Sequence, residues 1–322
     1  MKPARLQYRY ERLVQPKQPF HFIGTVHKPS HFPAPVDRFK NGNLWFSMNR
    51  KGKVYGIKLS PANSKNGDIL IRIYSRKKID EQETAHITNE IRYRFGMDID
   101  LTGFVDMASR DPVLAPVEKR WRGMRPSCAF SLYELLCITI SLQNAQVSRS
   151  VKMLETLLCK YGTLLLFGGE ELYGFWSPVT LAAREEKELR DLKVGYRAKS
   201  FLRVSQFFER HPEFENEVRV LPKDMARKRL QEIYGVGPAT AWYLLFESLK
   251  HLDAFDHVSP WEQKILSRLM FKKELVSSEH ILDEAQKRWG EWKMLAVHYL
   301  FEDLFWRRKR EHIDWLEDLI RL

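Results

Sequence analysis

The chain has 322 residues, of which 44% are hydrophobic and 12% aromatic; this is too much apolar material for a disordered protein. At roughly 100–200 residues per domain, the length predicts two or three domains. Lysine and arginine number 53 against 41 aspartate and glutamate residues, so the net charge of +12 favours a polyanionic partner, nucleic acid first.

Membrane and secretory classes are disfavoured by the sequence. It contains no run of about 18 apolar residues, so we expect no membrane span. The first residues lack the apolar core of a signal peptide. The cysteines are Cys128, Cys137 and Cys159, which provide neither a Cys-x-x-Cys pair nor a disulfide framework. We therefore expect an intracellular protein of the cytoplasm and nucleoid, or of the nucleus.

The first hundred residues predict strands, because short runs rich in β-branched and aromatic residues alternate with turn-forming clusters. The expected strands are Phe20–Ile23, Leu44–Phe46, Val54–Leu59 and Ile69–Tyr74, and the turns are Asn41–Asn43, Arg50–Lys53 and Asn63–Asp68. A helix over residues 80–95 then ends at Gly96. Residues 1–104 are predicted to form a β-rich N-terminal domain.

From about residue 105 onward the patterns predict helices. The segment Leu132–Leu142 is nearly all apolar, as expected for a helix buried on every side. The next helix has a face of Val147, Val151, Leu154 and Leu158 and a stop at Gly162. Further helices are expected over residues 184–192 and 198–208. Residues 105–322 are predicted to form a helical body of two lobes, so the fold class is mainly α with a β-rich N-terminal domain (α+β).

A two-glycine turn is the most informative local feature. Gly235-Val236-Gly237 joins a helix over residues 223–233 to a helix that begins at Pro238, where the missing N–H costs nothing. The free amides of the turn and of Ala239 and Thr240 then point outward at the positive end of the helix dipole, which suits a DNA phosphate. A plain helical turn is the alternative; a nucleotide-binding loop is disfavoured because no strand precedes the glycines.

Several spaced segments carry a resemblance to one family. They are Gly123–Pro126, Ile140–Val147, Leu192–Lys199, the hairpin over residues 223–249, and Trp289–Lys293 followed by Ala296 and Tyr299-Leu300. In this order they resemble the helix-hairpin-helix DNA glycosylases, most of all the 3-methyladenine DNA glycosylase II and 8-oxoguanine glycosylase types. The resemblance extends from about Phe20 to Phe301 and implies that family's fold.

The resemblance implies an enzyme that flips a damaged base out of double-stranded DNA. Gln143 and Asn144 match the position of the wedge or opposite-base contact, although an ordinary helix cap is the alternative. Damaged bases are held by stacking on aromatic faces, with an added cation–π contribution for alkylated bases. The candidates for the base pocket are Trp121, Trp242, Tyr243 and Trp261, each of which has structural packing as its alternative.

The resemblance implies a catalytic carboxylate, and the segment that should contain it can be aligned with the family's pattern in two ways. Matching Asp-His-Val to the family's pattern makes Asp256 the carboxylate. An ungapped match of the following helix instead puts Ser259 at that position, where Ser259-Pro260-Trp261-Glu262 reads as a capping box. Serine cannot supply the negative charge that stabilises an oxocarbenium-like transition state, so Asp256, and after it Glu262, are the candidates.

Two variants of the family are disfavoured. Ala239 occupies the position of the lysine that attacks the sugar in bifunctional members, so no lyase activity is expected. No cysteine follows residue 159, so no iron–sulfur cluster is expected. The expectation is a monomeric, monofunctional glycosylase without metal or redox cofactor, apart from a monovalent cation that the resemblance allows at the hairpin. Alkylated purines are the favoured substrates; the alternatives are a non-catalytic binder of distorted DNA and a glycosylase for oxidised or deaminated bases.

Overall fold

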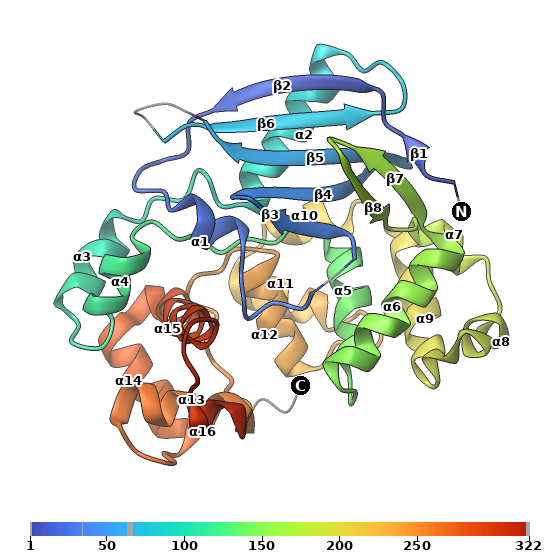
Figure 1. Ribbon diagram of the computed structural model, residues 1–322. Coiled ribbons are helices and arrows are strands. Elements are labelled where there is room, and N and C mark those ends of the chain that lie inside the picture. Colours follow the sequence, from blue (N-terminus) through green and yellow to red (C-terminus); the bar gives the residue numbers. More distant parts are fainter. Residues whose placement is uncertain (1, 34, 63–66, 320–322) are drawn as a thin grey trace.

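A computed structural model describes residues 2–33, 35–62 and 67–319. A five-stranded antiparallel sheet forms the upper layer of the molecule, and helices form two lobes beneath it (Figure 1). The strand order is β2 (Tyr8–Val14), β6 (Ile69–Ser75), β5 (Lys53–Pro61), β4 (Asn43–Arg50), β3 (Asp37–Lys40). This mixed architecture confirms the predicted fold class.

The predicted turns set the register of the hairpins. Asn41 and Gly42 have φ values of 50° and 69° between β3 and β4, and Lys51 and Gly52 have values of 47° and 71° between β4 and β5. Two residues with positive φ are typical of the tight turns that match the twist of paired strands. Of the predicted turn at residues 63–68, residues 63–66 lie outside the described residues, and Gly67 has a φ of 69°.

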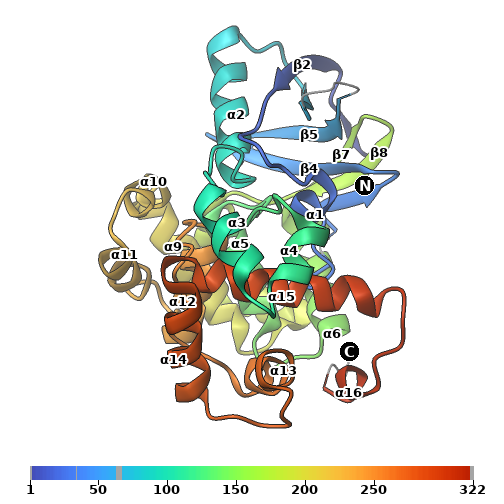
Figure 2. The same cartoon turned by 90° about the vertical axis from the view of Figure 1, so that its left-hand side faces the viewer.

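Helix α2 (Glu81–Arg94) packs across one face of this sheet (Figure 2). Its N-cap is Asp80, whose carboxylate accepts a hydrogen bond from the Glu83 amide, and Gly96 follows its end at a φ of 57°. Ile87 and Ile91 are fully buried in the core shared with the sheet. The predicted helix and its stop are therefore confirmed.

The predicted strand at Phe20–Ile23 is wrong, because residues 22–26 form helix α1 (Phe22–Val26). The His21 ring caps this helix by accepting a hydrogen bond from the Gly24 amide at 3.0 Å. Gly24 lies so close to Trp121 that an added Cβ would meet its ring at 3.1 Å. A helix cap and close packing thus override the β propensity of the aromatic and β-branched residues.

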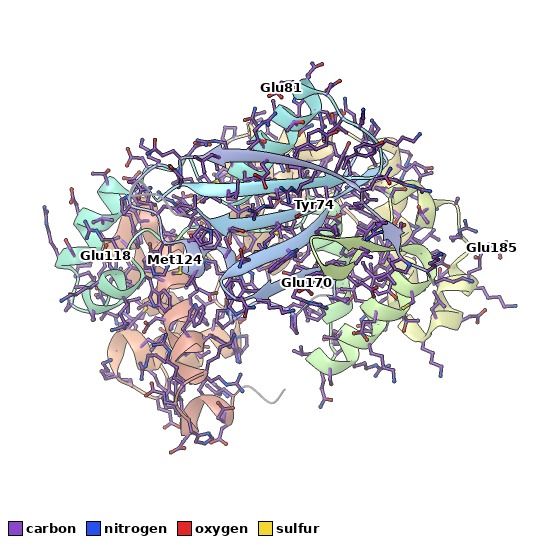
Figure 3. The ribbon with its side chains drawn as sticks, turned by 45° about the horizontal axis from the view of Figure 1, so that its top comes forward. Tyr74, Glu81, Glu118, Met124, Glu170 and Glu185 are labelled. Carbon is purple, nitrogen blue, oxygen red and sulfur yellow. The ribbon has the colours of Figure 1, made fainter. Side chains whose placement is uncertain are left out.

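The prediction that the chain is helical after about residue 105 is wrong at one place. Strands β7 (Thr163–Phe167) and β8 (Glu170–Gly174) form a hairpin that pairs with β1 (Ala4–Arg5). The turn uses Gly168 and Gly169, both at positive φ. The run of leucines in β7 packs with Trp45 and Tyr74 against the main sheet, which a single-segment pattern does not reveal. Figure 3 labels Tyr74 and Glu170, and Glu170 accepts hydrogen bonds from Arg38 and Lys40.

The helices form two lobes with separate cores. The first core is built on α5, α6, α9 and α12, and the second on α3, α4 and the helices after residue 260. The remaining elements are α3 (Thr102–Arg110), α4 (Ala115–Trp121), α5 (Leu132–Leu142), α6 (Val147–Tyr161), α7 (Pro178–Ala182), α8 (Glu186–Leu189), the irregular turn η1 (Arg190–Val194), α9 (Arg197–Arg210), α10 (Phe214–Arg219), α11 (Lys223–Leu230), α12 (Pro238–Glu247), α13 (Pro260–Phe271), α14 (Ser278–Trp289), the turn η2 (Gly290–Trp292), α15 (Lys293–Arg308) and α16 (Asp314–Glu317). Among the described residues, none of these helices combines the length and apolarity needed to cross a membrane.

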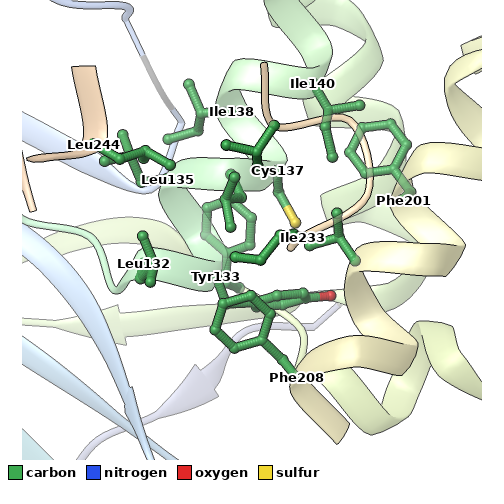
Figure 4. Packing of buried hydrophobic residues seen from close by; sticks show 14 of the residues in the cluster. Leu132, Tyr133, Leu135, Cys137, Ile138, Ile140, Phe201, Phe208, Ile233 and Leu244 are labelled. Atoms are coloured by element: carbon green, nitrogen blue, oxygen red, sulfur yellow. The ribbon is translucent and has the colours of Figure 1, made fainter. Parts of the chain in front are cut away.

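Helix α5 is the central helix of the first core (Figure 4). Ser131 and Glu134 form a capping box at its start, and most of its side chains are buried, as predicted. Tyr133 has its hydroxyl within 2.7 Å of Ser205 Oγ and accepts a hydrogen bond from the Trp176 indole at 2.8 Å. This rigid helix fixes the position of the loop that follows Leu142.

Candidate nucleic-acid interface

The two-glycine turn joins α11 and α12 as predicted, although α11 ends at Leu230 and not at residue 233. The buried side chains of Ile233 and Val236 anchor the turn, and the Val236 amide donates to the Ile233 carbonyl at 3.0 Å. Gly235 needs its φ of +83°, which a side chain would strain. Gly237 is the N-cap of α12 at a φ of −81°, and no side chain caps the helix.

The turn therefore exposes unpaired backbone donors. Amides in the first turn of a helix, here those of Ala239 and Thr240, have no partner within the helix. Gly235 and Gly237 are exposed, and a Cβ placed on either would meet nothing within 4 Å. A phosphate oxygen has unobstructed access to these amides at the positive end of the helix dipole.

The loop after α5 holds the two candidate wedge residues. Gln143 is the C-cap of α5, and its carbonyl accepts hydrogen bonds from the Arg197 guanidinium and, at 3.4 Å, from the Tyr196 hydroxyl. Asn144 is exposed, with a φ of 48°, and its side-chain amide donates to Tyr196 at 3.3 Å. Gln143 thus serves as the helix cap, whereas the Asn144 side chain faces solvent.

The start of α9 connects this loop to the hairpin. Tyr196 and Arg197 contact residues 143 and 144, while Lys199 lies with its Nζ 5.7 Å from the ring centre of Tyr234, next to Gly235. Tyr196 is 53% exposed, and the sequence analysis missed it. The sequence does contain a signal for an exposed Tyr196, because this bulky aromatic residue directly follows a glycine in a polar turn. We call the loop 143–146, Tyr196 and the hairpin 234–240 the outer rim.

A cavity of about 550 Å³ lies behind the outer rim. Leu142 and Val147, which flank the loop 143–146, line it, and so does Tyr243, one turn into α12. The opposite wall comes from the segment after α1, from β3 and from the end of α15. The cavity therefore lies between the candidate wedge and the hairpin helix, with its walls drawn from both lobes and the sheet.

The four aromatic pocket candidates are distributed unevenly around this cavity. Tyr243 lines it and is 42% exposed. Trp261 does not, but its ring centre is 6.3 Å from that of Phe305, which does. Trp242 faces Lys223 and Arg227, and Trp121 is buried with its indole donating to Asp303 at 2.8 Å. Aromatic lining residues that the sequence analysis missed are Phe32, Phe39, Phe95, Phe130 and Phe305.

Charged residues also line the cavity. Glu247 is buried on α12, with a carboxylate oxygen 3.5 Å from Nε2 of half-buried His31. Burial alone would raise the pKa of Glu247, but His31, Lys250 and Lys28 lower it overall. Burial likewise opposes protonation of His31, yet Glu247 and Glu302 raise the pKa of this imidazole above its usual value.

Lys28 extends this charged group into the interior. Its ammonium donates to the Arg125 carbonyl at 2.8 Å and lies 2.7 Å from Nε2 of His298. Burial lowers the pKa of Lys28 to about 8, and burial also lowers the pKa of His298 far enough to keep that ring neutral. Ser30 donates a hydrogen bond to Glu302, whose other carboxylate oxygen is buried without a partner.

The structure places Asp256 in a different environment. Its carboxylate is bound by Lys293 at the start of α15 and lies 3.5 Å from the Lys223 ammonium, which also donates to Asp253 at 2.5 Å. The side chain of Asp256 is 35% exposed. Asp256 is not among the described residues that line the cavity.

Ser259 is the N-cap of α13, as its capping box predicts. The Glu262 amide donates to the Ser259 hydroxyl, and the Ser259 amide donates to the Glu262 carboxylate at 2.8 Å. The carboxylate of Glu262 is therefore engaged in capping. Of the two carboxylate candidates, Asp256 is paired with lysines and Glu262 is used in capping.

Across residues 2–33, 35–62 and 67–319, no three His, Cys, Asp or Glu side chains are grouped to hold a metal ion.

Comparison with known proteins identifies similar sequences and folds. DNA-3-methyladenine glycosylase of Bacillus subtilis is 25% identical over 253 residues, or 77% of this chain and 82% of that protein. A probable N-glycosylase/DNA lyase of Methanothermobacter thermautotrophicus is 24% identical over 67% of this chain and 74% of its own length. No family model matches the chain.

Solved structures agree with these sequence matches. A 3-methyladenine DNA glycosylase from Archaeoglobus fulgidus superimposes with a TM-score of 0.75 at 18% identity, covering 94% of this chain and all of that one. The 8-oxoguanine glycosylase/lyase of Clostridium acetobutylicum, in complex with double-stranded DNA, gives 0.68 at 22% identity over 95% and 99%. At these identities the likeness establishes the fold.

Proposed function

We propose that this chain, which has the fold of the helix-hairpin-helix DNA glycosylases and resembles them in sequence, is a DNA glycosylase that removes a damaged base. One observation carries the proposal: the cavity is lined by Leu142 and Val147, which flank the loop with Asn144, and by Tyr243 on the helix that follows the two-glycine turn. A base extracted from a duplex has to pass between a wedge and a backbone clamp of this kind.

Each part of the outer rim then has one task. The amides of Ala239 and Thr240 hold a backbone phosphate and fix the position of the duplex. Asn144 enters the space that the base leaves, and Tyr196, which is hydrogen-bonded to it, supports it from the side. The flipped base enters the cavity, where Tyr243 and Phe305 offer aromatic surface.

The reaction is hydrolysis of the bond between the base and C1′ of the sugar. Positive charge develops on the sugar, and a nearby carboxylate stabilises it and orients the attacking water. We propose Asp256 for this role, because its carboxylate, unlike that of Glu262, is not engaged in capping. Its ion pairs with Lys223 and Lys293 require that it turns toward the DNA when the complex forms.

We propose a monofunctional enzyme, because Ala239 stands where a lyase of this fold places its lysine. A probable N-glycosylase/DNA lyase among the relatives makes a direct test worthwhile. Incubation with damaged duplex and sodium borohydride should trap no protein–DNA adduct. Trapping of a covalent adduct would show that another amine attacks the sugar.

An alkylated purine in double-stranded DNA is the substrate class that the resemblance favours, and relatives named 3-methyladenine glycosylases support it. An oxidised or deaminated base is the alternative, supported by the likeness to an 8-oxoguanine glycosylase/lyase. We propose that the enzyme acts as a monomer.

The second candidate function is binding of distorted DNA without release of a base. The specific observation in its favour is Ser259, which caps α13 where the resemblance places an aspartate. The Ser259→Asp variant distinguishes the two functions. If the wild type releases no base and the variant does, the site is one that has lost its carboxylate; release by the wild type supports the glycosylase.

A further inference from the structure

The ion pair between His31 and Glu247 is not explained by the phosphate clamp, the wedge or the Asp256 carboxylate. Both residues line the cavity, and they come from the segment after α1 and from the hairpin helix, 216 positions apart in the chain. The Glu247 side chain is only 6% exposed. Burial of a paired charge is costly, so a pair at the wall of a binding cavity is a candidate for function.

The geometry leaves one side of the imidazole available. The Glu247 oxygen lies 3.5 Å from Nε2 of His31, so Nδ1 is the ring nitrogen that this contact does not use. A carboxylate on one ring nitrogen orients the imidazole and stabilises its protonated form. His31 can then present a proton to a molecule inside the cavity.

The charge balance of the cavity points to an uncharged base. Arg38 and Arg308 line it, but Glu170 and Glu317 balance their charges. Of the carboxyl groups among the described lining residues, Glu247 is paired with His31, and burial raises the pKa of Asp37 to about 7. Asp37 is therefore only partly ionised near neutral pH and Glu247 is already paired, so the described lining residues offer little free negative charge to a cationic base, while Lys28 and Lys309 would repel one.

We propose that His31 donates a proton to the departing base, that Glu247 is the residue that positions it, and that the substrate is consequently a neutral damaged base, the oxidised or deaminated alternative, and not a cationic alkylated purine. This inference rests on the proposed glycosylase function. Neutral bases leave as anions unless they are protonated, whereas an N-alkylated purine already carries the positive charge that makes it a good leaving group.

The proton balance of the step is complete. The bond between C1′ and the base nitrogen breaks, and its electron pair goes to the base. The base takes a proton from the His31 imidazolium and leaves as a neutral molecule. Water adds its oxygen to C1′ and releases a proton, and the imidazole is reprotonated from solvent. The net reaction consumes one water and yields a free base and an abasic sugar.

Other titratable groups surround His31, so the dependence on pH belongs to the whole cluster. The groups that face it are Lys28 and His27 from its own segment, Asp37 at β3, Glu247 on α12, and His298 and Glu302 on α15. Glu247 and Glu302 raise the pKa of His31, and Lys28 opposes them. The acid form is the active one, so activity on a neutral base is present at low pH and lost as the pH rises through this pKa.

The test compares two kinds of substrate in single-turnover reactions across a pH series. The neutral probes are duplexes with hypoxanthine or 8-oxoguanine, and the cationic probe is a duplex with 7-methylguanine. The variants are His31→Gln and Glu247→Gln, and the exposed His86→Gln on α2 is the matched control. We expect His31→Gln to slow release of the neutral base about 100-fold, the low end of what a general acid contributes. Release of 7-methylguanine should change little.

The two variants also have distinct signatures in the pH profile. His31→Gln removes the alkaline decline in the rate for the neutral probe, and Glu247→Gln moves the decline to lower pH, because the imidazolium loses its partner. If His31→Gln is misfolded, it slows release from both kinds of probe alike. In that case the pH profile of Glu247→Gln tests the inference. An unchanged decline in both variants overturns the inference.

The wild type separates this inference from the function on which it rests. Preferred release of a neutral probe supports both. Release of 7-methylguanine alone overturns the inference and leaves the glycosylase function intact. Release of no base from any probe contradicts the glycosylase function itself.

Discussion

Under the proposed function, the outer rim and the cavity behind it would recognise their ligands in opposite ways. The rim presents exposed backbone amides and small residues, which suit a phosphate and do not read the identity of a base. The cavity presents buried charged residues, among them Glu247 and Lys28. Affinity for DNA should therefore depend on the rim, and the choice of base and the rate should depend on the cavity.

The largest effect on stability is expected inside the cavity wall, at Lys28. Lys28→Ala removes the partner of the Arg125 carbonyl and one of the charges that balance buried Glu302. Loss of one partner from a buried charged cluster typically costs about 3–5 kcal/mol. Chemical denaturation should show this loss, while the exposed Lys53→Ala variant should unfold like the wild type. Equal stability of the two variants would mean that the interior tolerates Glu302 without the positive charge of Lys28.

The next effect concerns the rate of base release. Asp256→Asn should slow base release by about 100- to 1,000-fold, the usual cost of removing a group that stabilises charge in a transition state. Affinity for damaged duplex should remain. Asp253→Asn is the control, because it shares Lys223 with Asp256 and should retain the rate. An unaffected rate in Asp256→Asn would move the carboxylate role to another residue, Glu262 first.

The glycines of the rim should separate folding from binding. Gly235→Ala forces a residue with a side chain to a φ of +83° and should destabilise the fold by about 1–2 kcal/mol. Gly237→Ala places its methyl group in open space and should leave stability unchanged while hindering the phosphate. Both should weaken binding to damaged and undamaged DNA alike. If Gly237→Ala binds normally, the phosphate does not lie at this turn.

The smallest effect is expected from Lys199, which lies beside Tyr234 at the edge of the rim. If its ammonium contacts a phosphate, Lys199→Ala should reduce the slope of log affinity against log salt by about 0.9. Base release at saturating enzyme should not change. A titration of binding at several salt concentrations checks this, and an unchanged slope would place Lys199 outside the DNA interface.

Most of the rim, though not Tyr196, was predictable from the sequence because its parts are local. The turn at Gly235–Gly237 and the start of α12 at Pro238 depend on a few neighbouring residues each, as does the cap of α13 at Ser259 outside the rim. Residue spacing in one segment is enough to specify such features. The same holds for α5, α6 and the hairpins of the main sheet.

The cavity was not predictable, because it depends on contacts between distant segments. His31 meets Glu247, and Lys28 meets His298 across 270 positions of sequence. No local pattern marks residues 28–31, and tertiary packing also turned the expected strand at residue 20 into helix α1. The aromatic candidates show the same limit, since Trp121 has the right chemistry but is buried against Asp303.

The decisive experiment is mass spectrometry of the bases that the wild-type protein releases from methylated, oxidised and deaminated duplex DNA, with Asp256→Asn alongside. We expect the wild type to release a damaged base and Asp256→Asn to release none, although both bind the DNA. Tight binding without release of any base would contradict the glycosylase function and leave a DNA-binding protein with Ser259 in place of a catalytic carboxylate.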